Sequence, residues 1–111
     1  MNNRDKIILH KIVDEVTIVS QMLDGMDEST FLASEEKMRA ICMTVINIGE
    51  LIKNLTDDFR KNQQNIPWKE MAGLRDITAH GYFTLRMPDV WEFVATELPT
   101  YIESIKTILE L

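Results

Sequence analysis

The apolar positions near the start of the chain recur at the spacing of an amphipathic helix. From residue 5 to about residue 26 an apolar side chain appears every three or four positions, with charged residues between. The stripe consists of Ile8, Ile12, Val16, Val19, Leu23 and Met26. The pattern predicts one long helix. His10 falls off the stripe among charged neighbours, which favours a solvated surface histidine.

A polar interruption precedes a second helix. Gly25 and residues 27–30 break the periodicity, and Thr30 or Ser34 is placed to cap the next helix by accepting a hydrogen bond from an early backbone N–H. We expect this helix to end near Asn54, with Gly49 at its middle indicating the close approach of another helix. Its stripe is Met38, Ile41, Val45, Ile48, Ile52 and Leu55, widened by Cys42, Met43, Ile46 and Leu51. So wide a stripe predicts a central helix, or one covered on a second side by a partner.

Prolines and glycines punctuate the second half of the chain. A short helical turn over residues 56–60 leads to a polar connector over residues 61–65. Pro67 suits the first position of a helix, and Gly81 suits its left-handed C-terminal cap. Pro88 is expected to open a final helix that Pro99 kinks or breaks. The stripe of that helix is Val90, Trp91, Val94, Leu98, Ile102, Ile105 and Leu109.

These elements predict an all-α fold, an antiparallel bundle of four main helices plus one short helix. The sequence has neither an alternating strand pattern nor an internal repeat. At 111 residues, 45% of them hydrophobic, we expect a single domain over residues 1–111. A chain of this size leaves much surface uncovered, so dimerisation is a plausible way to bury more of it.

The net charge narrows the choice of function. A charge of −6 opposes the counterion-release attraction behind most non-specific nucleic-acid binding, so activity on RNA requires a local positive site. The single cysteine, Cys42, lies between Ile41 and Met43, which predicts a buried and unreactive thiol. The chain has no apolar run of membrane-spanning length and its polar start is unlike a secretion signal, so we expect no membrane contact and a cytoplasmic location.

Arg75 and His80 are the residues best suited to chemistry. Arginine can bind phosphate oxygens and stabilise developing charge, and histidine can take a proton from a ribose 2′-hydroxyl or give one to the leaving oxygen. Five residues apart, they point about 140° from one another on an ideal helix. Either the helix end at Gly81 or a second copy of the chain must bring them together. Asp76 could orient or neutralise either residue, or simply face solvent.

Structural interpretations of this pair stay open. The spacing also arises by chance, Arg75 can be an ordinary surface residue, and His80 can satisfy terminal carbonyls as a cap. Lys69 and Arg86 could contact phosphate, although exposed basic residues are common. A metal site is not expected, because the sequence has no HExxH motif, no paired cysteines and no carboxylate cluster at ligand spacing from a histidine. We expect no cofactor.

The sequence around the pair resembles the HepT-like toxins of the HEPN superfamily. The resemblance rests on Ile66-Pro67-Trp68-Lys69-Glu70-Met71-Ala72-Gly73-Leu74-Arg75-Asp76 and His80-Gly81-Tyr82-Phe83. It extends to Ile48-Gly49-Glu50 and Lys53-Asn54-Leu55 upstream, and to Val90-Trp91 and Glu97-Leu98-Pro99 downstream. It therefore covers the chain from about Ala40 to its end.

The resemblance implies a helical homodimer in which Arg75 and His80 line a cleft at the interface and cut RNA, with no DNA substrate expected. It also implies a toxin–antitoxin pair in which a minimal nucleotidyltransferase is the antitoxin. Tyr82 matches the tyrosine that such an antitoxin modifies with AMP, and Asp76 stands where the family usually has a polar residue, often asparagine.

Two alternatives belong to other functional classes. The chain could be a non-catalytic binding module that docks a nucleotidyltransferase or helps to present its substrate, which would suit an acidic surface. It could also be a degenerate family member that only dimerises. Equal behaviour of the wild type and a His80→Ala variant would favour either alternative over the ribonuclease.

Overall fold

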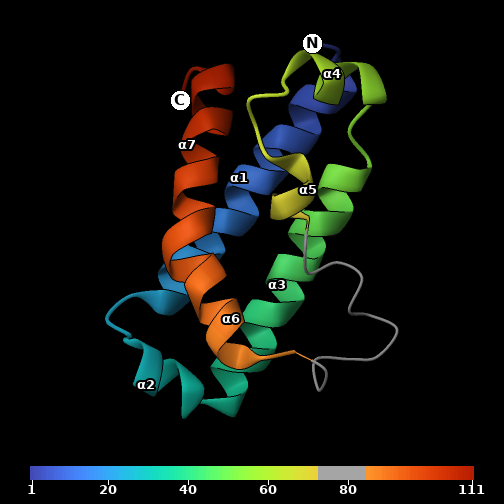
Figure 1. Ribbon diagram of the computed structural model, residues 1–111. Coiled ribbons are helices and arrows are strands. Elements are labelled where there is room, and N and C mark those ends of the chain that lie inside the picture. Colours follow the sequence, from blue (N-terminus) through green and yellow to red (C-terminus); the bar gives the residue numbers. More distant parts are fainter. Residues whose placement is uncertain (73–84) are drawn as a thin grey trace.

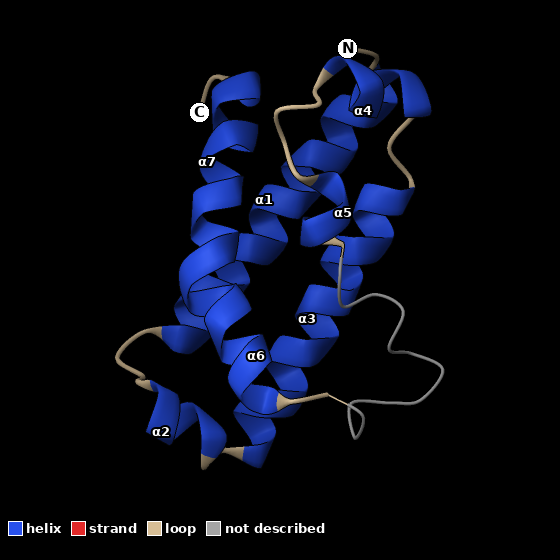
Figure 2. Cartoon of the chain, viewed as in Figure 1, coloured by secondary structure: helices blue, strands red, loops and turns tan. Residues whose placement is uncertain are grey.

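The structure of the protein is a computed structural model that describes residues 1–72 and 85–111. Those residues form helices joined by short turns, and no strand occurs among them (Figures 1 and 2). The all-α prediction is therefore confirmed for the described part of the chain. None of the helices found in it is both long enough and apolar enough to cross a membrane.

Helix α1 spans Asn3–Leu23 and buries the predicted stripe. Ile8, Ile12, Val16 and Val19 are buried, Leu23 and Met26 pack half-buried against the core, and His10 is exposed as expected. The side chain of Asn2 caps the helix by accepting a hydrogen bond of 2.7 Å from the backbone N–H of Asp5. The helix ends three residues before the predicted Met26. Gly25 follows that end at φ +74°, the left-handed conformation that favours glycine.

A short helix, α2 (Glu28–Leu32), occupies the segment that the sequence pattern treats as an interruption. Asp27 caps it by accepting a hydrogen bond from the backbone N–H of Thr30, so Thr30 lies inside α2 and does not cap the next helix. Five residues are too few to show a periodic stripe, and Phe31, which is fully buried, is the apolar anchor of this element. The prediction that residues 27–30 interrupt the helices is therefore wrong, because residues 28–32 form a helix of their own.

Helix α3 spans Glu35–Lys53 and begins directly after Ser34, the second of the two cap residues suggested by the sequence. Ser34 is the cap: its hydroxyl accepts a hydrogen bond of 3.2 Å from the backbone N–H of Lys37. The main stripe of α3 is confirmed, with Met38 half-buried and the other members buried. Among the widening residues Cys42 is buried, Ile46 and Leu51 are half-buried, and Met43 is 68% exposed. The widening residues therefore do not form one buried surface: Cys42, Ile46 and Leu51 are buried or half-buried, and Met43 faces solvent.

Two short helices follow α3. Helix α4 (Asp57–Asn62) is capped by Thr56, which confirms the predicted turn but extends it two residues into the expected connector. Helix α5 spans Trp68–Met71 and ends there, with Ala72 as its C-cap, and Pro67 stands one position earlier than predicted, at the N-cap. The predicted continuation of this helix through Ala72 is wrong, because α5 ends at Met71, and the predicted cap at Gly81 lies outside the described residues.

The last helical rod runs without interruption from α6 (Met87–Glu92) through a π-helical segment, η3 (Phe93–Glu97), into α7 (Leu98–Leu109). The Leu98 backbone N–H donates to the carbonyl of Phe93, five residues back. This wide turn gives the ring of Pro99 room in the first turn of α7. The predicted break at Pro99 does not occur, because the π-helical turn before the proline accommodates it within a continuous rod, and Pro88 lies at the start of α6 as expected.

Three long elements build the described bundle. Helix α1 runs antiparallel to α3 and to α7 and packs against both, while α2 closes the lower end beneath α6 (Figure 1). The ring of Phe31 in α2 lies 5.5 Å from that of Trp91 in α6, measured between ring centroids. Side chains from all of these helices share one apolar core. The fourth main helix predicted from Pro67 to Gly81 does not occur as one continuous helix, because α5 ends at Met71.

Candidate functional site

The four residues predicted to form the site, Arg75, Asp76, His80 and Tyr82, lie outside the described residues, because the description stops at Ala72 and resumes at Leu85. Their mutual geometry therefore remains a prediction. We call residues 73–84 the motif segment. The structure describes the residues on either side of it, which connect it to the bundle.

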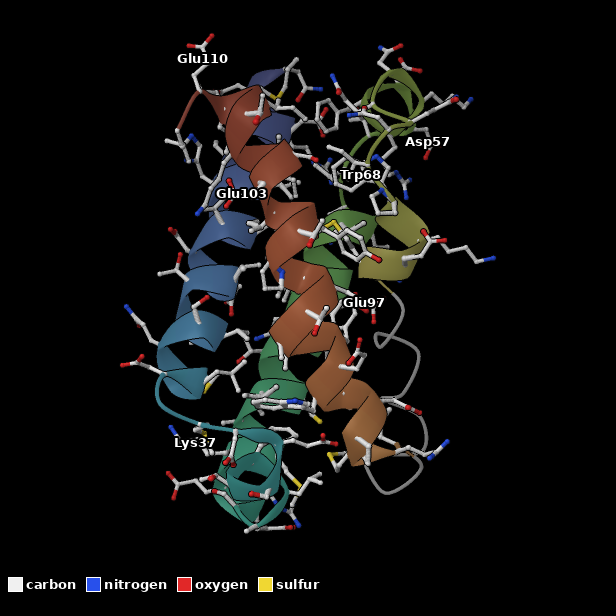
Figure 3. All side chains as sticks on the ribbon, turned by 60° about the vertical axis from the view of Figure 1, so that its left-hand side comes forward. Lys37, Asp57, Trp68, Glu97, Glu103 and Glu110 are labelled. Carbon is white, nitrogen blue, oxygen red and sulfur yellow. The ribbon has the colours of Figure 1, made fainter. Side chains whose placement is uncertain are left out.

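The entry to the motif segment is held by α5. Met71 is fully buried and Trp68 is nearly so, and α5 packs against α3. The Trp68 indole Nε1–H donates a hydrogen bond of 3.2 Å to the carbonyl of Gln63, and its ring lies 5.9 Å from the ring of Phe59 in α4. The chain therefore reaches residue 72 from an anchored helix, and Figure 3 shows Trp68 between α5 and the neighbouring helices.

The exit from the motif segment is held by α6. Leu85 and Met87 are half-buried against the core, and Val90 is fully buried. Arg86 lies between them with an exposed side chain, 3.9 Å from the carboxylate of Asp89. At the entry, Lys69 is exposed as well. Each end of the motif segment thus carries one exposed cation, Lys69 at the entry and the Asp89-paired Arg86 at the exit.

The carboxylates near α5 affect a tyrosine of α7. The Tyr101 hydroxyl donates a hydrogen bond of 3.3 Å to Glu97. Desolvation, followed by the negative charges of Glu97 and Glu70, raises the pKa of Tyr101 above its ordinary value. Tyr101 is therefore a neutral hydrogen-bond donor at physiological pH. Glu70 belongs to α5, so the entry to the motif segment lies within electrostatic reach of this pair.

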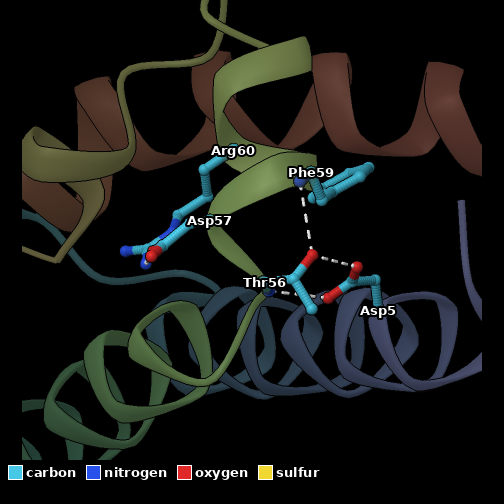
Figure 4. A network of polar contacts seen from close by, with 5 residues as sticks. All are labelled: Asp5, Thr56, Asp57, Phe59 and Arg60. Carbon is cyan, nitrogen blue, oxygen red and sulfur yellow. Dashed lines mark hydrogen bonds and ion pairs between the residues drawn. The ribbon is translucent and has the colours of Figure 1, made fainter.

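A buried polar contact fixes the element that leads toward α5. Asp5 in α1 is 1% exposed and accepts two hydrogen bonds from Thr56, one of 2.9 Å from its backbone N–H and one of 2.7 Å from its hydroxyl (Figure 4). The same hydroxyl accepts a hydrogen bond from the backbone N–H of Phe59. The sequence analysis missed this contact. Its only trace in the sequence is that Asp5 lies one turn before Ile8, on the line of the apolar stripe.

The described residues offer no alternative catalytic centre. His10, the second histidine, is exposed on α1. Cys42 is buried, and burial raises the pKa of its thiol to about 11, so the predicted inert thiol is supported. In residues 1–72 and 85–111 no three His, Cys, Asp or Glu side chains come together as a metal site.

One open groove lies on the surface between α1 and α3, with a volume of about 390 Å³. Its walls are Lys11, Asp14 and Glu15 on α1 and Asn47, Glu50, Leu51 and Asn54 on α3. Three carboxylates and one lysine make it unsuited to a phosphate backbone. We therefore separate this groove from the predicted ribonuclease site.

A chain whose described elements are all helical, with the Arg-x4-His-x-Tyr pattern in the sequence between α5 and α6, fits the class of HEPN-type helical proteins. Among protein families, the one described as "Ribonuclease HepT-like" matches residues 12–108 of this chain. This chain belongs to that HepT-like family.

Relatives agree with this assignment. "Putative RNase TTE0752" of Caldanaerobacter subterraneus is 32% identical over 102 residues, covering 92% of this chain and 91% of the relative. "Putative RNase MJ0127" of Methanocaldococcus jannaschii is 30% identical, covering 95% and 87%. "Probable ribonuclease HepT" of Thermococcus cleftensis is 28% identical, covering 90% and 91%. No solved structure matches the chain.

Proposed function

We propose that this protein is a metal-independent endoribonuclease in which Arg75 and His80 are the catalytic residues. The observation that carries the proposal is the family match over residues 12–108, which spans the Arg-x4-His-x-Tyr pattern, together with relatives named as ribonucleases. The anchored helices on either side of the motif segment support it, because catalytic side chains need a fixed scaffold.

The chemistry follows from the two side chains. The ribose 2′-oxygen attacks the adjacent phosphorus, the bond from phosphorus to the 5′-oxygen breaks, and the products carry a 2′,3′-cyclic phosphate and a 5′-hydroxyl. His80 removes the 2′-proton or protonates the leaving oxygen, and Arg75 neutralises the charge that builds on the phosphate oxygens. In this proposal Asp76 and Tyr82 support the pair. No metal or cofactor is required.

A homodimer supplies the missing geometry. Because Arg75 and His80 diverge by about 140° on an ideal helix, two copies that meet at the motif segment can place two histidines and two arginines around one phosphate, with one histidine as base and the other as acid. We propose that α3 near Gly49 also takes part in this contact. Sedimentation should show a dimer at micromolar concentration, and a strictly monomeric species would remove the shared cleft.

We further propose a toxin–antitoxin role. In it a small nucleotidyltransferase neutralises the protein by transferring AMP to Tyr82, which blocks the cleft. Intact-mass measurement after co-expression with the product of the adjacent gene should show an added AMP on the wild type and none on Tyr82→Phe. Unmodified wild-type protein from cells that contain an active partner would contradict this mode of control.

Growth of expressing cells tests the ribonuclease toxin. Induction of the wild type should arrest growth and degrade cellular RNA, and His80→Ala should do neither. His10→Ala is the matched control, because it removes the exposed histidine of α1, and it should be as toxic as the wild type. Equal growth of all three strains, at equal amounts of folded protein, would contradict the proposal.

The alternative function is a non-catalytic module that docks a nucleotidyltransferase or its substrate. The net charge of −6 favours it, since an acidic surface binds RNA poorly outside a local positive site. This alternative expects a stable complex with the neighbouring gene's product that survives both Arg75→Ala and His80→Ala, and no RNA cleavage by any of the proteins.

A further inference from the structure

The groove between α1 and α3 is a face of the bundle that no described element covers. On α1 the residues Ile7, Lys11, Asp14 and Ile18 fall within about 60° of one another around the helix axis, and on α3 Met43, Asn47, Glu50 and Asn54 repeat the same spacing. The two helices run antiparallel (Figure 1), so Ile18 and Met43 lie toward one end of the groove and Ile7 and Asn54 toward the other.

Large apolar side chains are exposed at the two ends of this face. Met43 is 68% exposed, Ile7 49% and Ile18 43%. Between them lie the charged walls of the groove. The face is about three helical turns long, with apolar side chains toward its ends and charged side chains between them, so a helix with the complementary pattern can lie along it.

The charges decide which partner fits. Asp14, Glu15 and Glu50 surround the groove with one lysine, Lys11, and no ion pair engages any of the four within the described part of the chain. Arg4 lies a turn beyond Ile7 on the same side of α1, at the end of the groove. The centre therefore carries an excess of negative charge that its own neighbours do not neutralise.

We propose that this groove docks a partner protein through an amphipathic helix that bears Lys or Arg at its centre and apolar residues toward its ends. A second copy of this chain is disfavoured, because it would set three carboxylates against three carboxylates. RNA is disfavoured because the carboxylates repel its phosphates. The surface is also distinct from the part of α3 proposed for dimerisation, since Gly49 lies about 130° around the helix axis from the middle of the groove face.

The test uses the full chain and two labelled synthetic peptides. Both are amphipathic helices with leucine toward the ends of one face; one has lysine at the central positions of that face and the other has glutamate. Fluorescence anisotropy at low salt should show the lysine peptide binding at least about tenfold more tightly than the glutamate peptide. Amide shifts in an NMR titration should map to the groove residues of α1 and α3.

Charge reversal gives the matched variants. The double substitution Asp14→Lys, Glu50→Lys should weaken the lysine peptide by about tenfold or more, while Glu103→Lys, Glu110→Lys changes the net charge equally at exposed positions of the C-terminal end and should leave binding within about twofold. All of these substitutions are at exposed positions, so circular dichroism should show unchanged folding.

Several outcomes would overturn the proposal. They are undetectable binding of the lysine peptide, equal binding of both peptides, an equal loss in the control variant, or shifts that map away from the groove. Loss of a dimer in the groove variant alone would assign the face to a second copy and overturn it too. RNA cleavage should be the same in both charge variants, so failure here is distinguishable from failure of the ribonuclease proposal.

Discussion

At the scale of single residues, Asp5 shows how one buried carboxylate can join distant parts of the chain. It lies 51 positions before Thr56, and its two oxygens accept the Thr56 backbone N–H and hydroxyl (Figure 4). Thr56 in turn caps α4 through Phe59. One carboxylate thus connects the start of α1 to the start of α4. No motif marks such a contact, because it depends on where the fold brings two separate segments.

Removing this carboxylate should be costly. Hydrogen bonds to charged groups contribute more than neutral ones, and truncating one partner leaves buried groups unsatisfied, so Asp5→Ala should lower the free energy of unfolding by about 2–4 kcal/mol. Urea denaturation followed by circular dichroism measures the change. Asp14→Ala, at an exposed position of the same helix, should stay within about 0.5 kcal/mol. Equal effects of the two substitutions would show that the Asp5 contact contributes little.

Cys42 should behave as an inert apolar residue. Burial raises the pKa of its thiol to about 11, above the ordinary value, so the neutral thiol predominates in the folded protein at pH 8. Labelling with a thiol reagent at pH 8 should be at least about a hundredfold slower than in urea, where the thiol is exposed and partly ionised. Comparable rates in the two conditions would mean that Cys42 is accessible in the native state.

Single residues also show what can and what cannot be predicted from the sequence. Arg75, His80 and Tyr82 suggest the proposed chemistry by their residue types and spacing, and the longer stretches around them carry the resemblance to the family. Their arrangement in space is not, since five residues on one ideal helix cannot aim both side chains at a single phosphate. The burial of Cys42 and the exposure of His10 were predictable from their immediate neighbours.

At the scale of elements, periodicity predicted the long helices well and the short ones poorly. The stripes of α1, α3 and the final rod are mostly buried, and a π-helical turn before Pro99 takes the place of the predicted kink or break. Helix α2 was missed because its five residues include only two large apolar side chains, Phe31 and Leu32, too few for a period. The choice between Thr30 and Ser34 as a cap could not be made without knowing that Asp27 already begins a helix.

The end of α1 depends on Gly25. Its φ of +74° lies in the left-handed region, and nothing lies within 4 Å of where a Cβ would stand, so the cost of substitution comes from the backbone alone. Gly25→Ala should lower the free energy of unfolding by about 1 kcal/mol, and Gly25→Asn by less, since asparagine tolerates this conformation better. Thermal or urea unfolding measures both. A neutral or stabilising Gly25→Ala would contradict the assigned turn.

At the scale of the whole molecule, the described bundle has two faces with different proposed roles. One includes the ends of α5 and α6, where the chain enters and leaves the motif segment, and we assign RNA cleavage and dimerisation to it. The other is the acidic groove of α1 and α3, which we assign to a protein partner. The sequence predicted the helical class and the bundle, but it could not show that groove, because α1 and α3 form it only when packed together.

Cleavage of RNA by the purified protein in the presence of EDTA tests the central claim most directly. The wild type and the exposed-histidine control His10→Ala should cut at equal rates with the chelator present, leaving cyclic phosphate ends, and Arg75→Ala and His80→Ala should each lose at least about a hundredfold. Abolition of cleavage by EDTA, or cleavage by His80→Ala at the wild-type rate, would contradict the account.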